Sequence, residues 1–321
     1  MTISIELGSS NTKIFEIGKG MVYCEPSVFA VRMKKNKSQV FAYGNKAYNI
    51  VKELQVDEKL IQPIKNGQIV DINLAKIMLD CILNDVIGTK IKRKDVDVVI
   101  AIPSCSTSKQ KDQFVLLMQK LGFVSINLVP QILAIASLLD DNINNPYLIV
   151  DIGAGKTEIG LCTIKNIINA ISLSIGGELV DLGIYEYLKN KYNFSVSRNE
   201  IEKSKKSIGS LFATDDTKCK LMAQKIDDLT SDYFIVSSKD FYDVLSMCYD
   251  IIIEGISAFI NSLDDEYKKE IFNVGIFFTG LGCDVIGFEK YFKSKLNTNI
   301  YILDSPSSVT VEGALKYYMN K

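Results

Sequence analysis

The stretch IVDIGAGKTEIGLC, from Ile149 to Cys162, joins an apolar strand pattern, a single acid, three small residues and a second strand pattern. Asp151 lies near the end of the first apolar run, and Gly153, Ala154 and Gly155 form the small-residue turn. Glycines in such a turn adopt positive φ or let a ligand approach the backbone. A carboxylate followed by a glycine turn is a place where a phosphate and a metal ion can meet, so this stretch predicts a phosphate site.

The same pattern occurs a second time near the N-terminus. The stretch IELGSSNTKIF (5–15) matches VDIGAGKTEIG (150–160) when the chain is shifted by 145 residues, the distance from Glu6 to Asp151. The aligned pairs include Gly8 with Gly153, Ser10 with Gly155, and Thr12 with Thr157. Either copy alone fits an ordinary β-hairpin. Two copies in one register favour a duplicated phosphate-binding unit.

Each hairpin is followed by strands that alternate with helices. In the first half, residues 95–103 predict a buried strand and residues 108–122 an amphipathic helix, and SINLVP and QILAIASLL continue as strand and helix. In the second half, residues 239–263 predict a long helix and residues 274–280 a buried strand. This alternation predicts largely parallel sheets covered on both faces, hence an α/β protein. At 321 residues, two such lobes are expected.

Composition limits both the partners and the compartment. Lysine plus arginine (37) nearly balances aspartate plus glutamate (38), so no global field favours nucleic acid, and we expect no nucleic-acid partner. The first residues run directly into a strand pattern, and no apolar run reaches the roughly 18 residues of a spanning helix, so a cytoplasmic protein is expected. The seven scattered cysteines lack a CxxC pair, which indicates reduced thiols.

The chain contains no histidine, which excludes several kinds of catalysis. Ser-His-Asp and Cys-His mechanisms, histidine-ligated zinc and imidazole proton shuttles all require this residue. Carboxylates, amides, lysines, hydroxyls, backbone N–H groups and a hard metal ion are left. These groups suit phosphoryl transfer.

The order of hairpin, second hairpin and FFTGLGCD (277–284) resembles the actin-like ATPase superfamily. The intervening segments resemble the MreB branch of bacterial actins: GKGMVYCEPSVFAV (18–31), YGNKAYNIV (43–51), IQPIKNGQIVDINLAKIML (61–79), LSIGGELVDLGIYEYLKNKYNFSVS (173–197) and ILDSPSSVTVEGALKYY (302–318). The resemblance covers essentially the whole chain. It implies the actin-like, ribonuclease H-like duplicated α/β fold, with two lobes and four subdomains.

The resemblance also implies where those subdomains lie. The first lobe has a core (IA) at 1–30, 70–140 and 304–321 with an insertion (IB) at 31–69; the second has a core (IIA) at 141–172 and 240–303 with an insertion (IIB) at 173–239. Within IIB, the stretch ATDDTKCKLMAQKIDDLTSDYFIVSS (213–238) is too irregular for individual elements to be assigned.

By this resemblance, the two turns hold the phosphates of ATP between the lobes. The residues implied at the phosphates are Ser9, Ser10, Asn11, Thr12 and Lys13 in the first turn and Gly153, Ala154, Gly155 and Thr157 in the second. Glu6 and Asp151 would hold Mg²⁺ through water. The family generally has aspartate at Glu6, so the longer side chain predicts altered metal geometry. The lysine at Lys13 resembles actin, and a solvated lysine on the outer face of the hairpin is the alternative.

The adenosine end is implied by a separate set of residues. Glu202 and Lys205 lie three residues apart on one face of the helix expected at 200–209, and the superfamily uses such a pair at the ribose and the base edge. A surface ion pair is the alternative. The chain segments that would line the base carry Gly176, Gly177, Gly280, Leu281, Gly282 and Cys283.

Three residues are implied in hydrolysis. Gln131 takes the position of the catalytic glutamate of MreB proteins and the glutamine of actin, and an amide orients water but is a poor proton acceptor. Lys156 stands where MreB proteins usually have threonine, and its charge can stabilise the ground state as well as the transition state. Asp151 holds the metal ion. We therefore expect ATP binding with slow hydrolysis.

The leading hypothesis is a filament-forming cytoskeletal ATPase that assembles head to tail with itself and serves cell shape or motility. Residues 84–95 combine basic and apolar side chains and are a candidate for peripheral membrane contact, with a solvated connection as the alternative. A non-polymerising actin-fold ATPase that acts as a chaperone or assembly factor is the main rival. A sugar or acetate kinase would need an aspartate base near the transferred phosphate, and no dedicated acid stands at Gln131 or Lys156.

Overall fold

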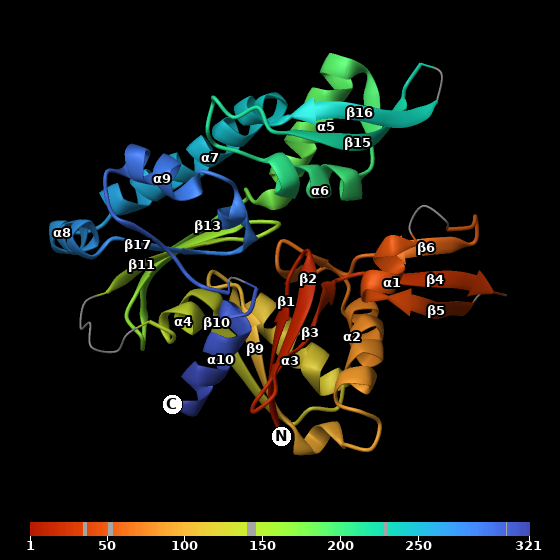
Figure 1. The fold of residues 1–321 in the computed structure, drawn as a ribbon. Helices are drawn as coiled ribbons and strands as arrows, with labels where there is room; N and C mark the ends of the chain where they lie inside the picture. The colour runs from red at the N-terminus through yellow and green to blue at the C-terminus, as the bar shows by residue number, and fades with distance from the viewer. Residues whose placement is uncertain (35–36, 51–53, 140–145, 228–229, 306) are drawn as a thin grey trace. The chain divides into compact units, whose positions relative to one another are not determined.

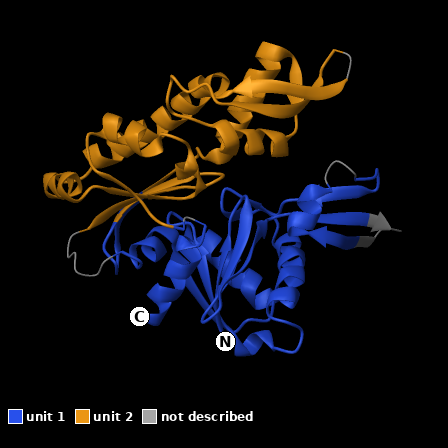
Figure 2. Cartoon of the chain, viewed as in Figure 1, with its two compact units in different colours: residues 1–144, 162–170, 305–321 blue, residues 145–161, 171–304 orange. Residues whose placement is uncertain are grey.

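The computed structural model describes residues 1–34, 37–50, 54–139, 146–227, 230–305 and 307–321 (Figure 1). The chain divides into two compact units (Figure 2). Unit 1 comprises residues 1–144, 162–170 and 305–321, and unit 2 comprises residues 145–161 and 171–304. The boundary expected between residues 140 and 141 lies outside the described residues.

Unit 1 is built on a five-stranded sheet with the order β10-β9-β1-β2-β3. Its strands are β1 (Thr2–Leu7), β2 (Asn11–Glu16), β3 (Gly20–Pro26), β9 (Asp97–Ile102) and β10 (Ser125–Pro130). Strand β1 is antiparallel to β2 and parallel to β9, which is parallel to β10. The helices of this unit are α1 (Gly44–Asn49), α2 (Ile72–Val86), α3 (Ser108–Lys120), α4 (Gln131–Ala136) and α10 (Val309–Met319).

A second five-stranded sheet has the order β13-β12-β11-β17-β18. Its strands are β11 (Tyr147–Ile152), β12 (Thr157–Cys162), β13 (Ile167–Leu173), β17 (Ile276–Thr279) and β18 (Ile300–Ile302). Strand β11 is parallel to β17, and β17 is parallel to β18. If the five strands of each sheet are numbered in chain order, both sheets have the same spatial order: third, second, first, fourth, fifth. The duplicated α/β architecture expected from the internal repeat is therefore confirmed.

The helices near the second sheet carry apolar faces. They are α5 (Gly177–Tyr192), α6 (Arg198–Ile208), α7 (Ser238–Asn261), α8 (Asp265–Val274) and α9 (Phe288–Leu296). On α7, inward residues recur every three or four positions, and the 24-residue helix buries a stripe from Phe241 to Ile260. Units 1 and 2 each have a separate hydrophobic core, one around Ile5 and Ile100 and the other around Val150 and Phe278.

Smaller sheets complete the fold. Unit 1 adds β4 (Phe29–Lys34), β5 (Lys37–Tyr43) and β6 (Glu58–Ile61) in the order β5-β4-β6, and the hairpin of β7 (Ile64–Lys65) and β8 (Gln68–Ile69). Unit 2 adds β14 (Phe194–Val196), β15 (Lys218–Lys225) and β16 (Ser231–Ser237). Short 3-10 helices lie at η2 (Arg93–Asp95) and η3 (Leu281–Asp284). None of the described helices is long and apolar enough to cross a membrane.

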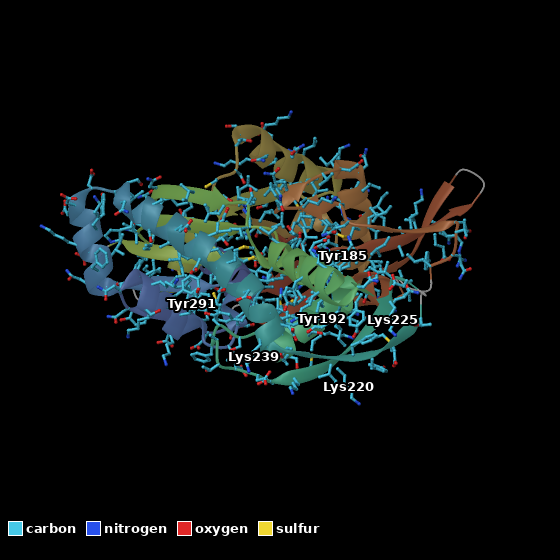
Figure 3. The ribbon with its side chains drawn as sticks, turned by 90° about the horizontal axis from the view of Figure 1, so that it is seen from above. Tyr185, Tyr192, Lys220, Lys225, Lys239 and Tyr291 are labelled. Carbon is cyan, nitrogen blue, oxygen red and sulfur yellow. The ribbon has the colours of Figure 1, made fainter. Side chains whose placement is uncertain are left out.

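The segment left unassigned by the sequence is an antiparallel pair of strands, β15 and β16. Tyr233 and Ile235 of β16 are exposed, while Val236 is buried, so apolar residues lie on both faces and the alternation typical of a strand is lost. Lys220 and Lys225 of β15 are also exposed (Figure 3). The remaining elements predicted from periodicity occur within a few residues of their expected bounds.

Candidate functional site

The first turn joins β1 to β2 and is held by its backbone. The N–H of Gly8 donates to the carbonyl of Asn11 at 3.0 Å. A Cβ on Gly8 would lie 2.7 Å from that oxygen, so only glycine fits this approach. Behind the turn, Ser27 donates to the Gly8 carbonyl at 2.7 Å, and its hydroxyl lies 2.9 Å from that of Thr12.

Several hydroxyls predicted at the phosphates are already engaged. The Thr12 side chain is buried against Ser27, and Ser9 Oγ accepts from the N–H of Gly67 at 3.1 Å. Ser10 and Asn11 are partly exposed. The donors this turn can still present to an anion are thus largely backbone N–H groups, which bind anions without a positive side chain.

Three predicted residues of unit 1 come together. Lys13 faces Glu6 across β1 and β2, and its Nζ lies 3.0 Å from Glu6 Oε2. Gln131, the first residue of α4, donates through Nε2 to Glu6 Oε1 at 3.4 Å. All three side chains are largely buried, so the alternative of a solvated Lys13 is wrong. The amide NH₂ of Gln131 thus faces a carboxylate, and its carbonyl oxygen is an acceptor.

The second turn repeats the backbone bond of the first. The N–H of Gly153 donates to the carbonyl of Lys156 at 3.0 Å, at the same offset of 145 residues from Gly8 and Asn11. The start of α5 closes over this turn: the N–H groups of Gly177 and Glu178 donate to the carbonyls of Gly153 (3.0 Å) and Ala154 (2.8 Å).

The contacts around the second turn explain why residue 176 is a glycine and where the hydroxyl of Thr157 is directed. A Cβ on Gly176 would lie 2.6 Å from both the Gly153 and Ala154 carbonyl oxygens, so a side chain there would push the turn away. Thr157 is buried and donates to the Ile175 carbonyl at 2.8 Å. Its hydroxyl is therefore directed to the backbone before α5, and Gly153, Ala154 and Gly155 are all partly exposed.

Lys156 is paired with a residue of β12, the strand that follows it. Its Nζ lies 2.6 Å from Oε1 of Glu158, whose side chain is only 1% exposed. By the offset of 145 residues, Glu158 corresponds to Lys13, so the charge on the second strand is reversed between the two hairpins. An ammonium against a buried carboxylate offsets the cost of removing that carboxylate from water.

The GLG segment packs closely on β11. Gly280 has φ +88°, and a Cβ there would lie 2.3 Å from the Ile152 carbonyl and 2.6 Å from Oδ1 of Asp151. Gly282 lies against the Ile152 side chain in the same way. These two glycines therefore bring η3 up to Asp151, inside unit 2, while Leu281 remains exposed.

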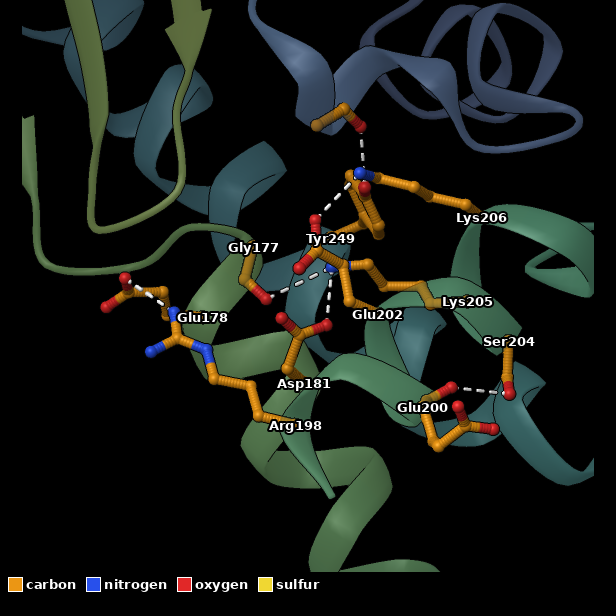
Figure 4. A network of polar contacts seen from close by, with 11 residues as sticks. Gly177, Glu178, Asp181, Arg198, Glu200, Glu202, Ser204, Lys205, Lys206 and Tyr249 are labelled. Atoms are coloured by element: carbon orange, nitrogen blue, oxygen red, sulfur yellow. Dashed lines mark hydrogen bonds and ion pairs between the residues drawn. The ribbon is translucent and has the colours of Figure 1, made fainter. Parts of the chain in front are cut away.

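Glu202 and Lys205, the two residues expected at the ribose and the base edge, have partners that the sequence did not indicate (Figure 4). Lys205 Nζ lies 2.6 Å from Oδ1 of the buried Asp181 and donates to the Gly177 carbonyl at 3.2 Å. Glu202 instead pairs with Lys206 on the surface at 2.7 Å. Burial raises the pKa of Asp181, and the Lys205 ammonium opposes this shift. Glu202 and Lys205 thus form separate ion pairs, one exposed and one buried.

Tyr249 connects this network to η3. Its hydroxyl donates to the Gly282 carbonyl at 2.6 Å, and burial raises the pKa of its phenol. Cys283 is buried, and its Sγ lies 3.1 Å from the Thr279 carbonyl. Burial likewise raises the pKa of this thiol, which makes it a packing group rather than a nucleophile. A cavity of about 590 Å³ opens beside Cys283, Asp284 and the start of α9.

The family model for the MreB/Mbl protein matches residues 1–321. The chain belongs to the MreB/Mbl family. The cell shape-determining protein Mbl of Bacillus subtilis is 25% identical over 316 residues, which cover 97% of this chain and 93% of that protein. The cell shape-determining protein MreB of Escherichia coli is 24% identical and is covered to 92%, with 98% of this chain aligned.

Solved structures agree with the actin-like fold of the MreB/Mbl family. The crystal structure of MreB 5 of Spiroplasma citri bound to AMPPNP has a TM-score of 0.91 at 24% identity and covers 99% of this chain and 96% of that one. The MamK double helical filament has a TM-score of 0.82 at 18% identity, with 99% of both chains covered. The actin-like, two-lobed fold expected from the resemblance is confirmed.

Sequence reasoning missed three residues of this MreB/Mbl chain that contact predicted ones. Glu158 holds Lys156, Asp181 holds Lys205, and Tyr249 holds Gly282. Glu158 follows the second turn directly and could have been noticed as the acid at the position of Lys13 in the repeat. Asp181 and Tyr249 lie inside helices without a motif, so the sequence offered no signal for them.

Proposed function

We propose that this chain is a bacterial actin that binds ATP with Mg²⁺ and assembles head to tail into cytoskeletal filaments. The observation that carries the proposal is the pair of turns whose backbone bonds, Gly8 to Asn11 and Gly153 to Lys156, recur at one offset in a chain that the MreB/Mbl family model matches over residues 1–321. Support also comes from relatives of the same fold, one bound to AMPPNP and one in a double helical filament.

In the proposed site, the chain's own groups divide the work. Backbone N–H groups of the first turn and of Gly153, Ala154 and Gly155 bind the phosphates, and Lys13 adds positive charge. Gln131 orients the attacking water through its amide oxygen. The segments with Gly176, Gly177 and Leu281 would lie along the nucleoside, together with Lys205.

The carboxylates fit a magnesium ion held through water. Glu6 already accepts from Lys13 and Gln131, so an ion that keeps part of its hydration shell suits it better than one that must be bound directly. Asp151, beside Gly280, would be the second carboxylate. When bound, the ion would neutralise phosphate charge.

Hydrolysis should be slow. An amide at Gln131 is a poor proton acceptor, and Lys156 is held against Glu158 rather than free to follow developing charge. Phosphate release from the purified protein with ATP and Mg²⁺ tests this. We expect Gln131→Glu to release phosphate faster than the wild type; fast wild-type turnover that Gln131→Glu does not change would contradict the proposal.

Assembly is tested by negative-stain microscopy and pelleting with ATP, ADP and no nucleotide. We expect filaments that depend on nucleotide. Calorimetric ATP binding without filaments under any condition would instead support a non-polymerising actin-fold ATPase, such as an assembly factor. Pelleting with anionic vesicles tests membrane contact at residues 84–95, where Lys90, Ile91 and Lys92 are exposed.

A further inference from the structure

We propose that the ion pair of Lys13 with Glu6 makes ATP binding less dependent on Mg²⁺ than the carboxylate of Glu6 alone would make it. The inference rests on the proposed function, because it concerns the phosphate end of the same site. It goes further by assigning Lys13 a second role. Besides adding charge toward the phosphates, the lysine limits the attraction of unit 1 for the metal ion.

Both carboxylate oxygens of Glu6 have hydrogen-bond donors within unit 1. Lys13 Nζ donates to Oε2 at 3.0 Å, and Gln131 Nε2 donates to Oε1 at 3.4 Å. The water molecules around a magnesium ion are also donors, and they would bind the remaining lone pairs of the same oxygens. A hydrated ion is therefore not excluded from Glu6, but it shares the carboxylate with an ammonium group.

The ammonium reduces the electrostatic attraction of Glu6 for a cation. Without Lys13, the carboxylate would present one negative charge. With Lys13, the pair has no net charge, and the ammonium repels a divalent ion placed beside it. The side chains of Lys13 and Glu6 are only 13% and 10% exposed, so water and salt screen these interactions weakly. The repulsion is thus large enough to change the metal affinity measurably.

The backbone keeps the two charges together. Glu6 of β1 and Lys13 of β2 are directly opposite each other in the antiparallel register. Residues in such a pair have Cβ atoms about 4.5–5.5 Å apart, so their side chains remain within contact range. The bond from Gly8 to Asn11 closes the hairpin just beyond them. A ligand at the turn therefore meets the carboxylate and the ammonium together.

The second hairpin lacks a lysine at the equivalent position. At the offset of 145 residues, Glu6 corresponds to Asp151 and Lys13 corresponds to Glu158. The effect of Lys13 on the metal ion therefore belongs to the first hairpin, and a substitution at Lys13 isolates it. Under the proposed function, the attraction of Asp151 for the ion is kept in such a variant.

The test measures the affinity for ATP by calorimetry on the full chain, once with excess Mg²⁺ and once with EDTA. The ratio of the two affinities reports how far binding depends on the metal ion. Formation of the complex between ATP and Mg²⁺ in solution is the same for every variant, so a change in this ratio comes from the protein. We expect the ratio to rise about tenfold in Lys13→Met, the size expected for one interaction with a charged group.

The partner residue should change the ratio in the opposite direction. Glu6→Gln removes the negative charge and keeps the ammonium, so the ratio should fall below that of the wild type. The double variant with Lys13→Met has neither charge, and its ratio should return towards that of the wild type, because the pair is also neutral when both charges are present. Lys13→Gln removes the charge but keeps a donor for Glu6, and it should behave as Lys13→Met does.

Lys19→Met is the matched control. Lys19 pairs with Glu16 at 2.8 Å in the turn that joins β2 to β3, and its side chain is 65% exposed. This variant also loses a lysine paired with a glutamate of the same sheet, but its ratio should equal that of the wild type. Thermal unfolding checks that each variant is folded.

The outcomes separate the two proposals. If the wild type binds ATP but Lys13→Met and Lys13→Gln keep the wild-type ratio, Lys13 does not limit the metal ion; the inference is overturned and the proposed function stands. If Glu6→Gln keeps the wild-type ratio, Glu6 does not attract the ion, and the inference is overturned as well. If the wild type binds ATP in neither solution, the proposed function itself fails, and this inference with it.

Discussion

At the scale of single residues, the pairing of Lys156 with Glu158 predicts how the second turn responds to mutation. Replacing Lys156 with threonine, the usual MreB residue, removes the ammonium from a carboxylate that is 1% exposed. Breaking such a buried pair costs about 3–5 kcal/mol. We expect Lys156→Thr to lower the free energy of unfolding by an amount of this order, measured by urea denaturation.

The compensating variant is the control. Lys156→Thr combined with Glu158→Gln removes both charges and should recover most of the lost stability, since no buried ion is left without its partner. Equal stability of Lys156→Thr and the wild type would show that other contacts of Glu158 suffice. The activity of Lys156→Thr should then be compared with that of the double variant, so that a loss of folding is not taken for a loss of catalysis.

The sequence predicted the candidate site residues better than it predicted which side chains those residues contact. Glu6, Lys13 and Gln131 were each found from the repeat or the resemblance, and they do lie together. Their bonding was not predictable, since Gln131 is separated from Glu6 by 125 residues along the chain. Asp181 was missed for the same reason: the partner of a helical acid depends on how helices pack, which a single sequence does not encode locally.

At the scale of elements, Asp240 joins the start of α7 to the end of α5. It accepts from Lys191 Nζ at 2.8 Å, from the Tyr192 hydroxyl at 2.7 Å and from the Ser237 N–H at 2.9 Å. Burial raises the pKa of Asp240, but these hydrogen bonds outweigh burial and lower the pKa to about 2. The carboxylate is therefore charged in the folded protein well below the pH at which a free aspartate protonates.

This lowered pKa predicts an acid-dependent contribution to stability. The contribution is complete above the ordinary pKa of 3.8 and is lost as the pH falls towards about 2. Asp240→Asn should lower the free energy of unfolding by about 2 kcal/mol at neutral pH and flatten its decline between pH 4 and 2. Asp243→Asn, an exposed acid on the same helix, is the control. An unchanged acid profile in Asp240→Asn would contradict the assignment.

Elements were predictable where one face is apolar and the other is not. Helix α7 shows this regularity, because its buried residues recur with the period of the helix. Strand β16 does not, because Tyr233 and Ile235 are exposed on the face opposite to Val236. The sequence could not separate this strand from a loop without knowing which side chains the neighbouring helices would cover.

At the scale of the whole molecule, the separate cores of units 1 and 2 predict how ATP should stabilise the protein. Under the proposed function, the first turn in unit 1 and the second turn in unit 2 would each bind phosphate. A ligand that binds only the folded state stabilises it by about 2.7 kcal/mol at a concentration 100 times its Kd. We expect scanning calorimetry with ATP and Mg²⁺ to move the unfolding of both units to higher temperature.

The same scans with EDTA, and with no nucleotide, serve as controls. A shift in only one of two resolved transitions would show that a single unit binds the nucleotide.

The fold at this scale was predictable because the repeat and the family resemblance extend along the chain, and both sheets have the same strand order. The division into four subdomains remains a proposal.

The matching bonds from Gly8 to Asn11 and from Gly153 to Lys156 have a consequence for how the two halves diverged. A loop held by main-chain hydrogen bonds keeps its shape when its side chains are substituted, as long as each leading glycine is retained. One half could therefore acquire a lysine opposite its acid and the other a glutamate, without either frame being rebuilt. The same backbone bond can therefore support different side-chain chemistry in the two halves.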